Sequence, residues 1–272
     1  MILDEENNIV NYLSSFNSPR HATLIDPEKQ TPNEASKICQ IAIEAGTDLI
    51  LIGGSTTDQN SVNETVEVIQ ETMELQHWAS TQNGIFEDQK TTVPVILFPN
   101  ASSTLSTKSD GILFMSLLNS TSSKYLVKEQ KKATSYIEKH KIKTISTAYL
   151  VFKPGMKVGE VGKADLIDPE NIEETKSWIR LAKYFNFKIL YLEAGSGSPN
   201  PIPKSTIKIS KEEFDGLLFV GGGIKTPEQA NNAALAGADW VVTGNLIESF
   251  TDYNQLKSKL KKLIDEIKKS NN

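Results

Sequence analysis

The sequence predicts an α/β protein built as a closed (β/α)8 barrel. Eight short runs of β-type residues alternate with helical patterns along the 272 residues, and several of these runs are almost continuously apolar. Such runs are typical of parallel strands that are covered on both faces. A barrel of about 250 residues also fits the chain length. An open, doubly wound sheet is the second possibility, because it shows the same alternation of strands and helices.

The expected elements can be placed along the chain. The first long helix is expected to begin near Thr31, with Pro32 at an early helical position, and to end at Gly46. Residues 1–20 are expected to contain a helical segment, and residues 252–269 an amphipathic helix with a solvated charged face. We expect residues 1–272 to form one TIM-barrel domain. The predicted strands are His21–Ile25, Asp48–Ile52, Val93–Phe98, Gly111–Met115, Thr144–Val151, Lys188–Leu192, Leu217–Val220 and Trp240–Val242.

One connection breaks the barrel pattern. Only residues 99–110 separate the third predicted strand from the fourth, and their Ser- and Thr-rich sequence is a poor helix former. We therefore predict that the third barrel helix is missing or replaced. Three other segments, residues 77–92, 152–170 and 196–204, are predicted to be loops.

Composition excludes several classes of protein. The net charge of −5 argues against a dedicated nucleic-acid binder, which usually carries a strongly basic face. The single cysteine, Cys39, excludes intrachain disulfides and cysteine-rich zinc sites. No apolar run approaches the ~18 residues of a membrane span, and the acidic start Met1–Glu6 is unlike a signal peptide. The expectation is a cytoplasmic globular protein without a membrane span.

Glycines after the last two strands indicate an anion site. In a barrel, the residues that follow each strand face one mouth, where ligands bind. Gly221–Gly223 and Gly244-Asn245 each precede a helical start, so backbone N–H groups can converge there on a phosphate. The alternative is that these glycines only form turns.

Carboxylates follow two other strands. Asp26 and Ser55 offer hard oxygen ligands on one rim, which suits Mg²⁺ bound together with a substrate phosphate; Asp26 in an Asp-Pro pair can instead only cap a turn. Glu193 can orient a hydroxyl or remove its proton, or form a salt bridge in the rim. Phe98 and Tyr149 are interpreted as barrel packing, with walls of a groove as the alternative. The histidines show no metal-ligand spacing.

These segments resemble the geranylgeranylglyceryl phosphate synthase family, the barrel prenyltransferases of archaeal ether-lipid synthesis and their bacterial relatives. The family also lacks a normal third barrel helix. Asn100 departs from it, because the family often has glycine after Phe-Pro. The resemblance covers about residues 21–248 and rests on Thr23–Pro27, Ile52–Ser55, Pro94–Pro99, Ile112–Ser120, Thr147–Leu150, Tyr191–Gly197, Val220–Ile224 and Thr243–Asn245.

The resemblance implies a reaction and its site. The C3 hydroxyl of sn-glycerol 1-phosphate would attack C1 of a polyprenyl diphosphate, expected to be geranylgeranyl diphosphate, and displace diphosphate. Asp26 and Ser55 would bind Mg²⁺, and Asp26 and Glu193 would be the catalytic residues. The glycerol phosphate would be bound by Tyr191, Leu192, Glu193, Ala194, Gly195, Ser196, Gly197, Gly222, Gly223, Gly244 and Asn245.

The resemblance also implies a homo-oligomer, either a dimer or a hexamer.

Two other functions stay open on the residues alone. One is a different barrel enzyme that acts on a sugar phosphate, and the other is a phosphate-binding barrel without catalysis.

Overall fold

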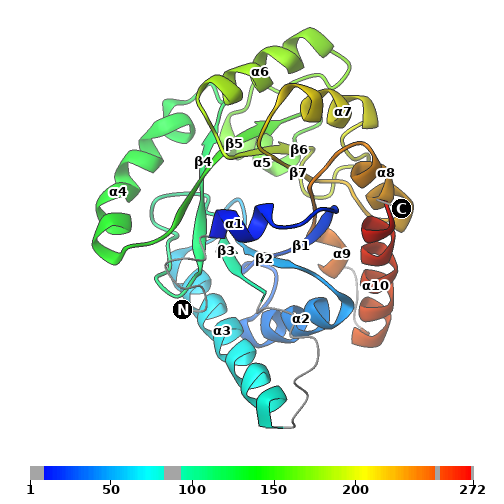
Figure 1. Cartoon of the computed structure of the whole chain (residues 1–272). Helices are drawn as coiled ribbons and strands as arrows, with labels where there is room; N and C mark the ends of the chain where they lie inside the picture. The colour runs from blue at the N-terminus through cyan, green and yellow to red at the C-terminus, as the bar shows by residue number, and fades with distance from the viewer. Residues whose placement is uncertain (1–8, 83–92, 249–251, 271–272) are drawn as a thin grey trace.

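Eight parallel strands close into a barrel in the computed structural model, which describes residues 9–82, 93–248 and 252–270 (Figure 1). Each strand pairs with the next along the chain, and β8 pairs with β1 in parallel. The predicted barrel is confirmed, and the open sheet is excluded. The strands are β1 (Arg20–Ile25), β2 (Leu49–Ile52), β3 (Val95–Leu97), β4 (Gly111–Leu117), β5 (Thr144–Val151), β6 (Ile189–Glu193), β7 (Leu217–Gly221) and β8 (Trp240–Thr243).

The strand predictions were confirmed with shifted ends. The largest shift is in β3, which begins after Pro94 instead of at Val93, because proline has no N–H to donate to a ladder. The carbonyl of Pro94 still accepts a hydrogen bond from Ile50 N at 3.0 Å. β4 extends to Leu117 and β6 to Glu193, so both reach further toward the mouth than predicted.

The helices surround the barrel. The predicted start of α2 is confirmed by a capping box between Thr31 and Glu34, and its end by Gly46 in the left-handed conformation. Residues 98–110 are all described and contain no helix, as predicted. The helices are α1 (Ile9–Ser14), α2 (Pro32–Ala45), α3 (Gln59–Gln82), the π-helical turn η1 (Lys124–Lys128), α4 (Glu129–His140), α5 (Met156–Gly162), α6 (Ile172–Tyr184), α7 (Lys204–Glu213), α8 (Pro227–Leu235), α9 (Asn245–Glu248) and α10 (Tyr253–Lys269).

Two of the loop predictions need correction. α3 continues to Gln82, so residues 77–82 are helical, while residues 83–92 lie outside the described residues. The segment 152–170 contains α5, which we did not predict. Of the expected N-terminal helical segment, α1 covers Ile9–Ser14, and residues 1–8 lie outside the described part.

An aromatic column fills the barrel. Phe98, Tyr149 and Tyr191 meet near the mouth, with ring centroids 5.2 to 5.6 Å apart. Below them Phe219 stacks on Trp240 at 5.6 Å, and Trp240 Nε1 donates to the α1 carbonyl of Leu13 at 3.2 Å. α1 thus lies across the barrel and closes the end opposite the mouth (Figure 1).

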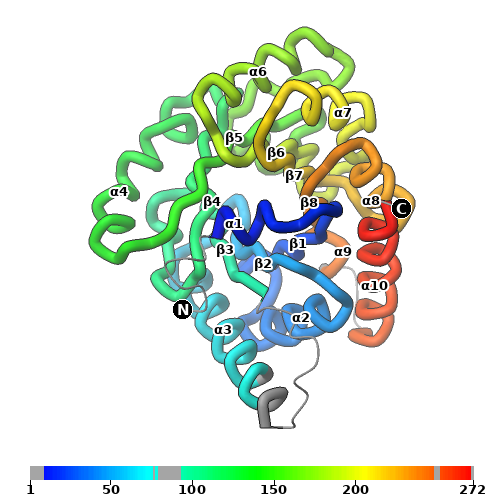
Figure 2. Tube along the Cα trace, viewed as in Figure 1, coloured from blue at the N-terminus to red at the C-terminus, as the bar shows by residue number. Residues whose placement is uncertain are grey.

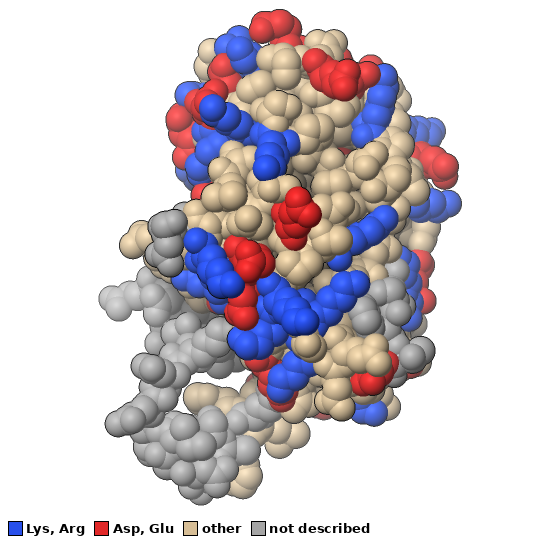
Figure 3. All heavy atoms as spheres, turned by 90° about the vertical axis from the view of Figure 1, so that its right-hand side faces the viewer, with Lys and Arg blue, Asp and Glu red and all other residues tan. Residues whose placement is uncertain are grey.

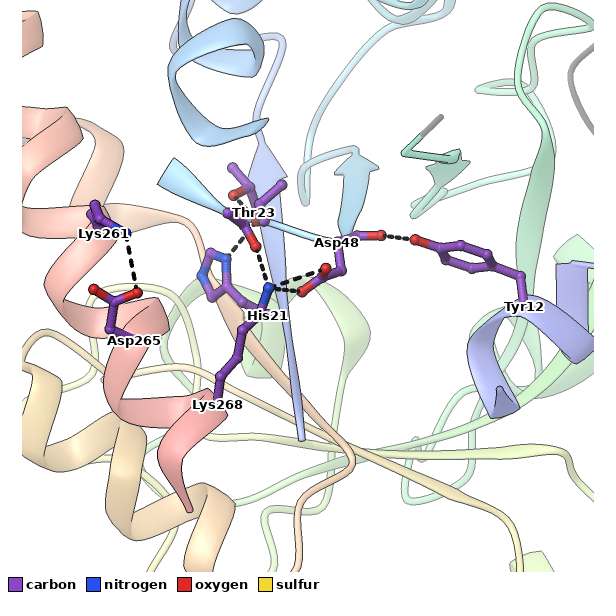
Figure 4. Close-up of polar contacts among 9 residues, drawn as sticks. Tyr12, His21, Thr23, Asp48, Lys261, Asp265 and Lys268 are labelled. Carbon is purple, nitrogen blue, oxygen red and sulfur yellow. Dashed lines mark hydrogen bonds and ion pairs between the residues drawn. The ribbon is translucent and has the colours of Figure 1, made fainter. Parts of the chain in front are cut away.

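The C-terminal helix holds the wall together from outside. α10 lies beside both α2 and α8 (Figure 2). Lys268 donates to the carbonyl of Gly46 at 2.7 Å and lies 2.8 Å from Asp48 Oδ2. The carbonyl of Asp48 accepts from Tyr12 of α1, so one residue joins α10 to the barrel closure (Figure 4).

The outer face of α10 carries charges of both signs. Figure 3 shows Lys and Arg side chains interspersed with Asp and Glu on this side of the molecule. Lys257 pairs with Glu44 at 2.7 Å, and Lys261 with Asp265 at 3.3 Å. The arrangement agrees with the predicted solvated face. None of the described helices is long and apolar enough to cross a bilayer.

Replacing Lys268 with alanine is expected to lower the free energy of unfolding by about 1–3 kcal/mol, because the Asp48 carboxylate loses its partner where it is buried. The Asp48 side chain is only 6% exposed. Lys261→Ala is the matched control in the same helix, and its exposed pair is worth at most about 0.5 kcal/mol. Denaturant titration of both variants measures the difference, and equal losses would contradict the role given to Lys268.

Candidate active site

A cavity of about 320 Å³ opens at the carboxyl ends of the strands. Its volume lies in the range of about 300–1,000 Å³ that is typical of ligand pockets. One part is polar and lies beside Asp26, Ser55 and Glu193. The other part is apolar and runs along the connection after β3 as far as Leu105, beside β4 and Ala133 of α4. The missing third helix therefore leaves room that this apolar arm occupies.

A smaller hollow of about 40 Å³ adjoins the cavity at the ends of β6, β7 and β8. Gly222 and Gly223, with φ of 82° and 72°, form one side. A Cβ at Gly222 would lie 2.3 Å from Glu193 Oε1, so no side chain fits there. Gly244, Asn245 and Lys225 also line the hollow. Backbone N–H groups at glycine-rich strand ends of this kind favour a bound anion.

Glu193 lies where the cavity and the hollow meet. Its side chain is 5% exposed, Gly195 N donates to its Oε1 at 2.7 Å, and the Tyr149 hydroxyl donates to its Oε2 at 3.3 Å. Burial raises the pKa of the Glu193 carboxyl to about 7, although hydrogen bonds from Gly195, Tyr149 and Tyr191 oppose part of the shift. A carboxyl with this pKa can accept and release a proton near neutral pH.

The loop after β6 is fixed to the end of β8. The Asn245 side-chain oxygen accepts from Ser196 Oγ and from Gly197 N, both at 2.7 Å. A Cβ at Gly195 would lie 2.7 Å from Gly155 O, so the loop also packs closely on the segment before α5. These contacts hold the residues after Glu193 in place around both cavities.

Asp26 and Ser55 both line the polar part of the cavity. The Asp26 carboxylate lies against Gly54, where a Cβ would be 2.3 Å from Oδ1, and it accepts from Glu28 N at 3.1 Å. Its side chain is 16% exposed, so the carboxylate remains open to the cavity. Among the described residues there is no group of three or more His, Cys, Asp or Glu placed to hold a metal. The donors present are a carboxylate and a hydroxyl, the hard oxygen ligands that suit Mg²⁺ shared with a substrate phosphate.

The structure brings most of the predicted site residues to one mouth. The exceptions follow strand alternation: Leu192 and Ala194 are buried in the cluster between the barrel wall and the helices, and line neither cavity. Gly195 and Gly197 act through the loop contacts above. Charged lining residues that sequence analysis did not assign include Glu28, Lys29 and Lys225. Each of these three follows a predicted strand-end motif by one or two positions, which is the signal that would have found it.

A closed α/β barrel that carries an anion-binding hollow beside a buried carboxylate is the architecture of a phosphate-binding barrel enzyme. Residues 14–269 match the PcrB family. The chain belongs to this family.

Several named relatives cover nearly the whole chain. The geranylgeranylglyceryl phosphate synthase of Thermoplasma volcanium is 43% identical over 253 residues, which are 93% of this chain and 92% of the relative. Its wild-type structure has a TM-score of 0.85 at 41% identity, over 96% of this chain and 98% of that chain. The crystal structure of (S)-3-O-geranylgeranylglyceryl phosphate synthase from Thermoplasma acidophilum in complex with sn-glycerol-1-phosphate matches with a TM-score of 0.85 at 39% identity, over 96% of this chain and 99% of that chain.

The raised pKa of Glu193 has a measurable consequence for stability. The pKa of the carboxyl is about 7 in the native state and near its ordinary value of 4.5 in the unfolded state. Its contribution to the free energy of unfolding is therefore complete below pH 4.5 and is lost as pH rises through 7. Relative to Glu193→Gln, the wild type is expected to lose about 3 kcal/mol of unfolding free energy across this interval.

Denaturant titrations of both proteins at several pH values measure this difference. Tyr149→Phe removes a hydrogen bond to the charged carboxylate, so it should extend the loss to higher pH. Parallel pH profiles for wild type and Glu193→Gln would contradict the raised pKa.

Proposed function

We propose that this chain joins a polyprenyl group, geranylgeranyl in the relatives' name, to the C3 hydroxyl of sn-glycerol 1-phosphate. The reaction forms one C–O ether bond and releases diphosphate. The observation that carries the proposal is the junction of a glycine-walled hollow with a larger cavity that continues into an apolar arm, with the Glu193 carboxylate buried where hollow and cavity meet. Two substrates of opposite character would each find a matching surface, and the carboxylate would lie between them.

The hollow would hold the phosphate of sn-glycerol 1-phosphate. Gly222, Gly223 and Gly244 let the backbone approach the anion, and Lys225 and Asn245 also line the hollow. The chain has a net charge of −5, so local backbone donors are what make anion binding favourable in an acidic protein. Ser196 lines both the hollow and the cavity and would lie near the glycerol hydroxyls.

Glu193 would orient the C3 hydroxyl and accept its proton as the ether bond forms. A carboxyl with a pKa of about 7 is a stronger base than an exposed glutamate. The hydroxyls of Tyr149 and Tyr191 stay protonated, because burial and the charge of Glu193 raise the pKa of both well above the ordinary value. They can therefore remain hydrogen-bond donors to the carboxylate throughout the reaction.

The apolar arm would hold the prenyl chain. Its walls are aliphatic and aromatic side chains of β3, β4, α4 and α5 with their connections, among them Phe98, Leu105, Ile112, Phe114 and Val158. This arm favours prenyl transfer over the sugar-phosphate and pure-binding alternatives, since neither requires an extended apolar cavity beside the phosphate hollow.

Asp26 and Ser55 would hold Mg²⁺ together with the prenyl diphosphate. The metal would neutralise the leaving diphosphate, which lets the allylic C–O bond break. Asp26 would supply a carboxylate oxygen, and Ser55 a neutral oxygen. Glu28, which accepts a hydrogen bond from Thr56, lines the same part of the cavity.

The family relationship supports three further proposals. Residues 1–272 form one domain, the protein is a homo-oligomer (a dimer or a hexamer), and it works in the cytoplasm. Light scattering of the purified protein determines the number of subunits.

Asp26→Asn is expected to reduce Mg²⁺-dependent transfer by at least about 100-fold, because the diphosphate loses its metal anchor. The assay incubates protein with Mg²⁺, radiolabelled sn-glycerol 1-phosphate and a C20 or C35 prenyl diphosphate, then counts label in the organic phase. Binding of sn-glycerol 1-phosphate, measured by calorimetry, should stay close to that of the wild type.

The stereoisomer sn-glycerol 3-phosphate is the substrate control, and omission of Mg²⁺ is the metal control. Wild-type protein that binds glycerol phosphate yet transfers neither donor would overturn the proposed function and favour a phosphate-binding barrel.

Ala133→Phe tests the apolar arm. Ala133 is 5% exposed and lies at the α4 side of the cavity, so a phenyl ring would shorten the space for the prenyl chain. The variant should prefer shorter donors by about 10-fold or more in kcat/KM, in line with the loss of a few buried methylenes. Ala182→Phe on α6, which is also buried but lies outside the cavity, controls for general damage to packing. An unchanged donor preference would exclude this arm as the prenyl site.

A further inference from the structure

The border of the apolar arm carries exposed aliphatic side chains. Leu126 and Val127 of η1 are 36% and 56% exposed, and Met156 at the start of α5 is 36% exposed. Their neighbours Tyr125 and Lys157 line the cavity itself. We call residues 124–132 together with residues 156 and 157 the rim surface.

The π-helical turn holds its aliphatic side chains outward. Ser116 of β4 donates to the carbonyl of Leu126 at 2.6 Å, and Gln130 donates to the carbonyl of Tyr125 at 3.1 Å and to that of Met115. Tyr125 packs toward the barrel cluster. The turn is thus held to β4 directly at the Leu126 carbonyl and through Gln130 at the Tyr125 carbonyl, and it presents Leu126 and Val127 to solvent. π-helical turns of this kind occur frequently at functional sites.

The two parts of the rim surface are joined to each other. Thr121 N donates to the carbonyl of Lys163 at 2.9 Å, and Ser120 Oγ to the carbonyl of Gly162 at 2.6 Å. The segment before η1 is therefore held to the end of α5 by hydrogen bonds. The cavity lies between them, with Gln130 on one side and Val158 on the other.

Lysines surround the aliphatic side chains. Lys124, Lys128, Lys131 and Lys132 fall within nine residues, where the only carboxylate, Glu129, is buried and pairs with Lys132 at 3.0 Å. Over the described part of the chain, neither Lys128 nor Lys131 has a carboxylate within 4.0 Å. On α10, by contrast, four of the six lysines are each paired with a carboxylate, namely Lys257, Lys261, Lys268 and Lys269. The rim surface is thus a basic and apolar border on a protein of net charge −5.

We propose that the rim surface docks on an anionic lipid bilayer. Leu126, Val127 and Met156 enter the headgroup region, and the lysines contact lipid phosphates. Aliphatic side chains flanked by lysines are what interfacial binding requires. Docking places the entrance of the apolar arm against the bilayer. The prenyl donor can then pass from the bilayer into the cavity, and the lipid product back into the bilayer, without exposing their chains to water. This role rests on the proposed function.

A second copy of the chain is a poorer occupant. A two-fold contact through the same surface would place the lysines of one copy against those of the other. Like charges brought together in this way oppose association. An anionic bilayer complements both the charge and the apolar side chains.

The test measures co-sedimentation of the full chain with vesicles of phosphatidylglycerol and phosphatidylcholine, without substrates. Wild type should bind these vesicles and not vesicles of phosphatidylcholine alone. Lys128→Gln/Lys131→Gln should weaken binding about 10- to 30-fold, because each lysine near an anionic surface raises the affinity for the membrane about fivefold. Leu126→Ser/Val127→Ser should weaken it about 10-fold or more through lost apolar burial.

Matched controls lie at the opposite end of the barrel. Lys139→Gln/Lys141→Gln removes two lysines at the far end of α4, and Tyr184→Ser/Phe185→Ser removes two aromatic residues that are 79% and 63% exposed. Both should bind vesicles as the wild type does. All four variants should keep transfer with a short, water-soluble prenyl diphosphate, so loss of docking is distinguished from loss of the proposed activity.

Three results would overturn the proposal: no binding by the wild type, equal binding to neutral vesicles, or equal losses in the rim and control variants. If Leu126→Ser/Val127→Ser changes the number of subunits by light scattering and leaves vesicle binding intact, the rim surface is an interface between copies and the bilayer role is wrong.

Discussion

The burial of one carboxylate, Glu193, is the constraint on which the mouth of this barrel depends. An ionised carboxylate away from water is stable only when hydrogen-bond donors surround it. Gly195 and two tyrosines supply those donors. Gly222 must lack a side chain because its Cβ would meet Glu193 Oε1 at 2.3 Å. The glycine that opens the anion hollow is therefore also the one that lets the carboxylate lie beside it.

The missing third helix determines the second half of the site. A full helix after β3 would pack over the strands where the apolar arm now lies. The connection instead stays ordered through local polar contacts, since Asn100 donates to the carbonyl of Thr57 at 3.3 Å and accepts from Thr104 at 3.0 Å. The Ser102 hydroxyl also donates a hydrogen bond to the buried Glu129 carboxylate of α4. Asn100 thus bridges two loops at a position where a glycine would leave these contacts unmade.

The sequence predicted the strands and the strand-end motifs because both are local. Apolar runs mark parallel strands, and parallel strands bring their carboxyl ends to one mouth. α5 was missed because glycines at 155, 159 and 162 lower helix propensity, whereas packing favours the helix: a Cβ at Gly162 would lie 2.5 Å from Leu117. The acceptor role of Asn245 toward the loop after β6 also depends on a contact between residues 48 or 49 positions apart. No local pattern encodes such contacts.

The two ends of the barrel are connected through its wall. His21 is fully buried, and its ring nitrogens lie 2.5 Å from Thr47 Oγ1 and 2.9 Å from Thr243 Oγ1. Thr47 belongs to the turn that α10 holds through Gly46 and Asp48 (Figure 4). Thr243 ends β8 and directly precedes Gly244 of the anion hollow. Polar groups buried in this way are rigid because breaking any one contact leaves another unsatisfied. Anchoring of α10 at the closed end and the position of Gly244 at the open end therefore depend on the same buried residues.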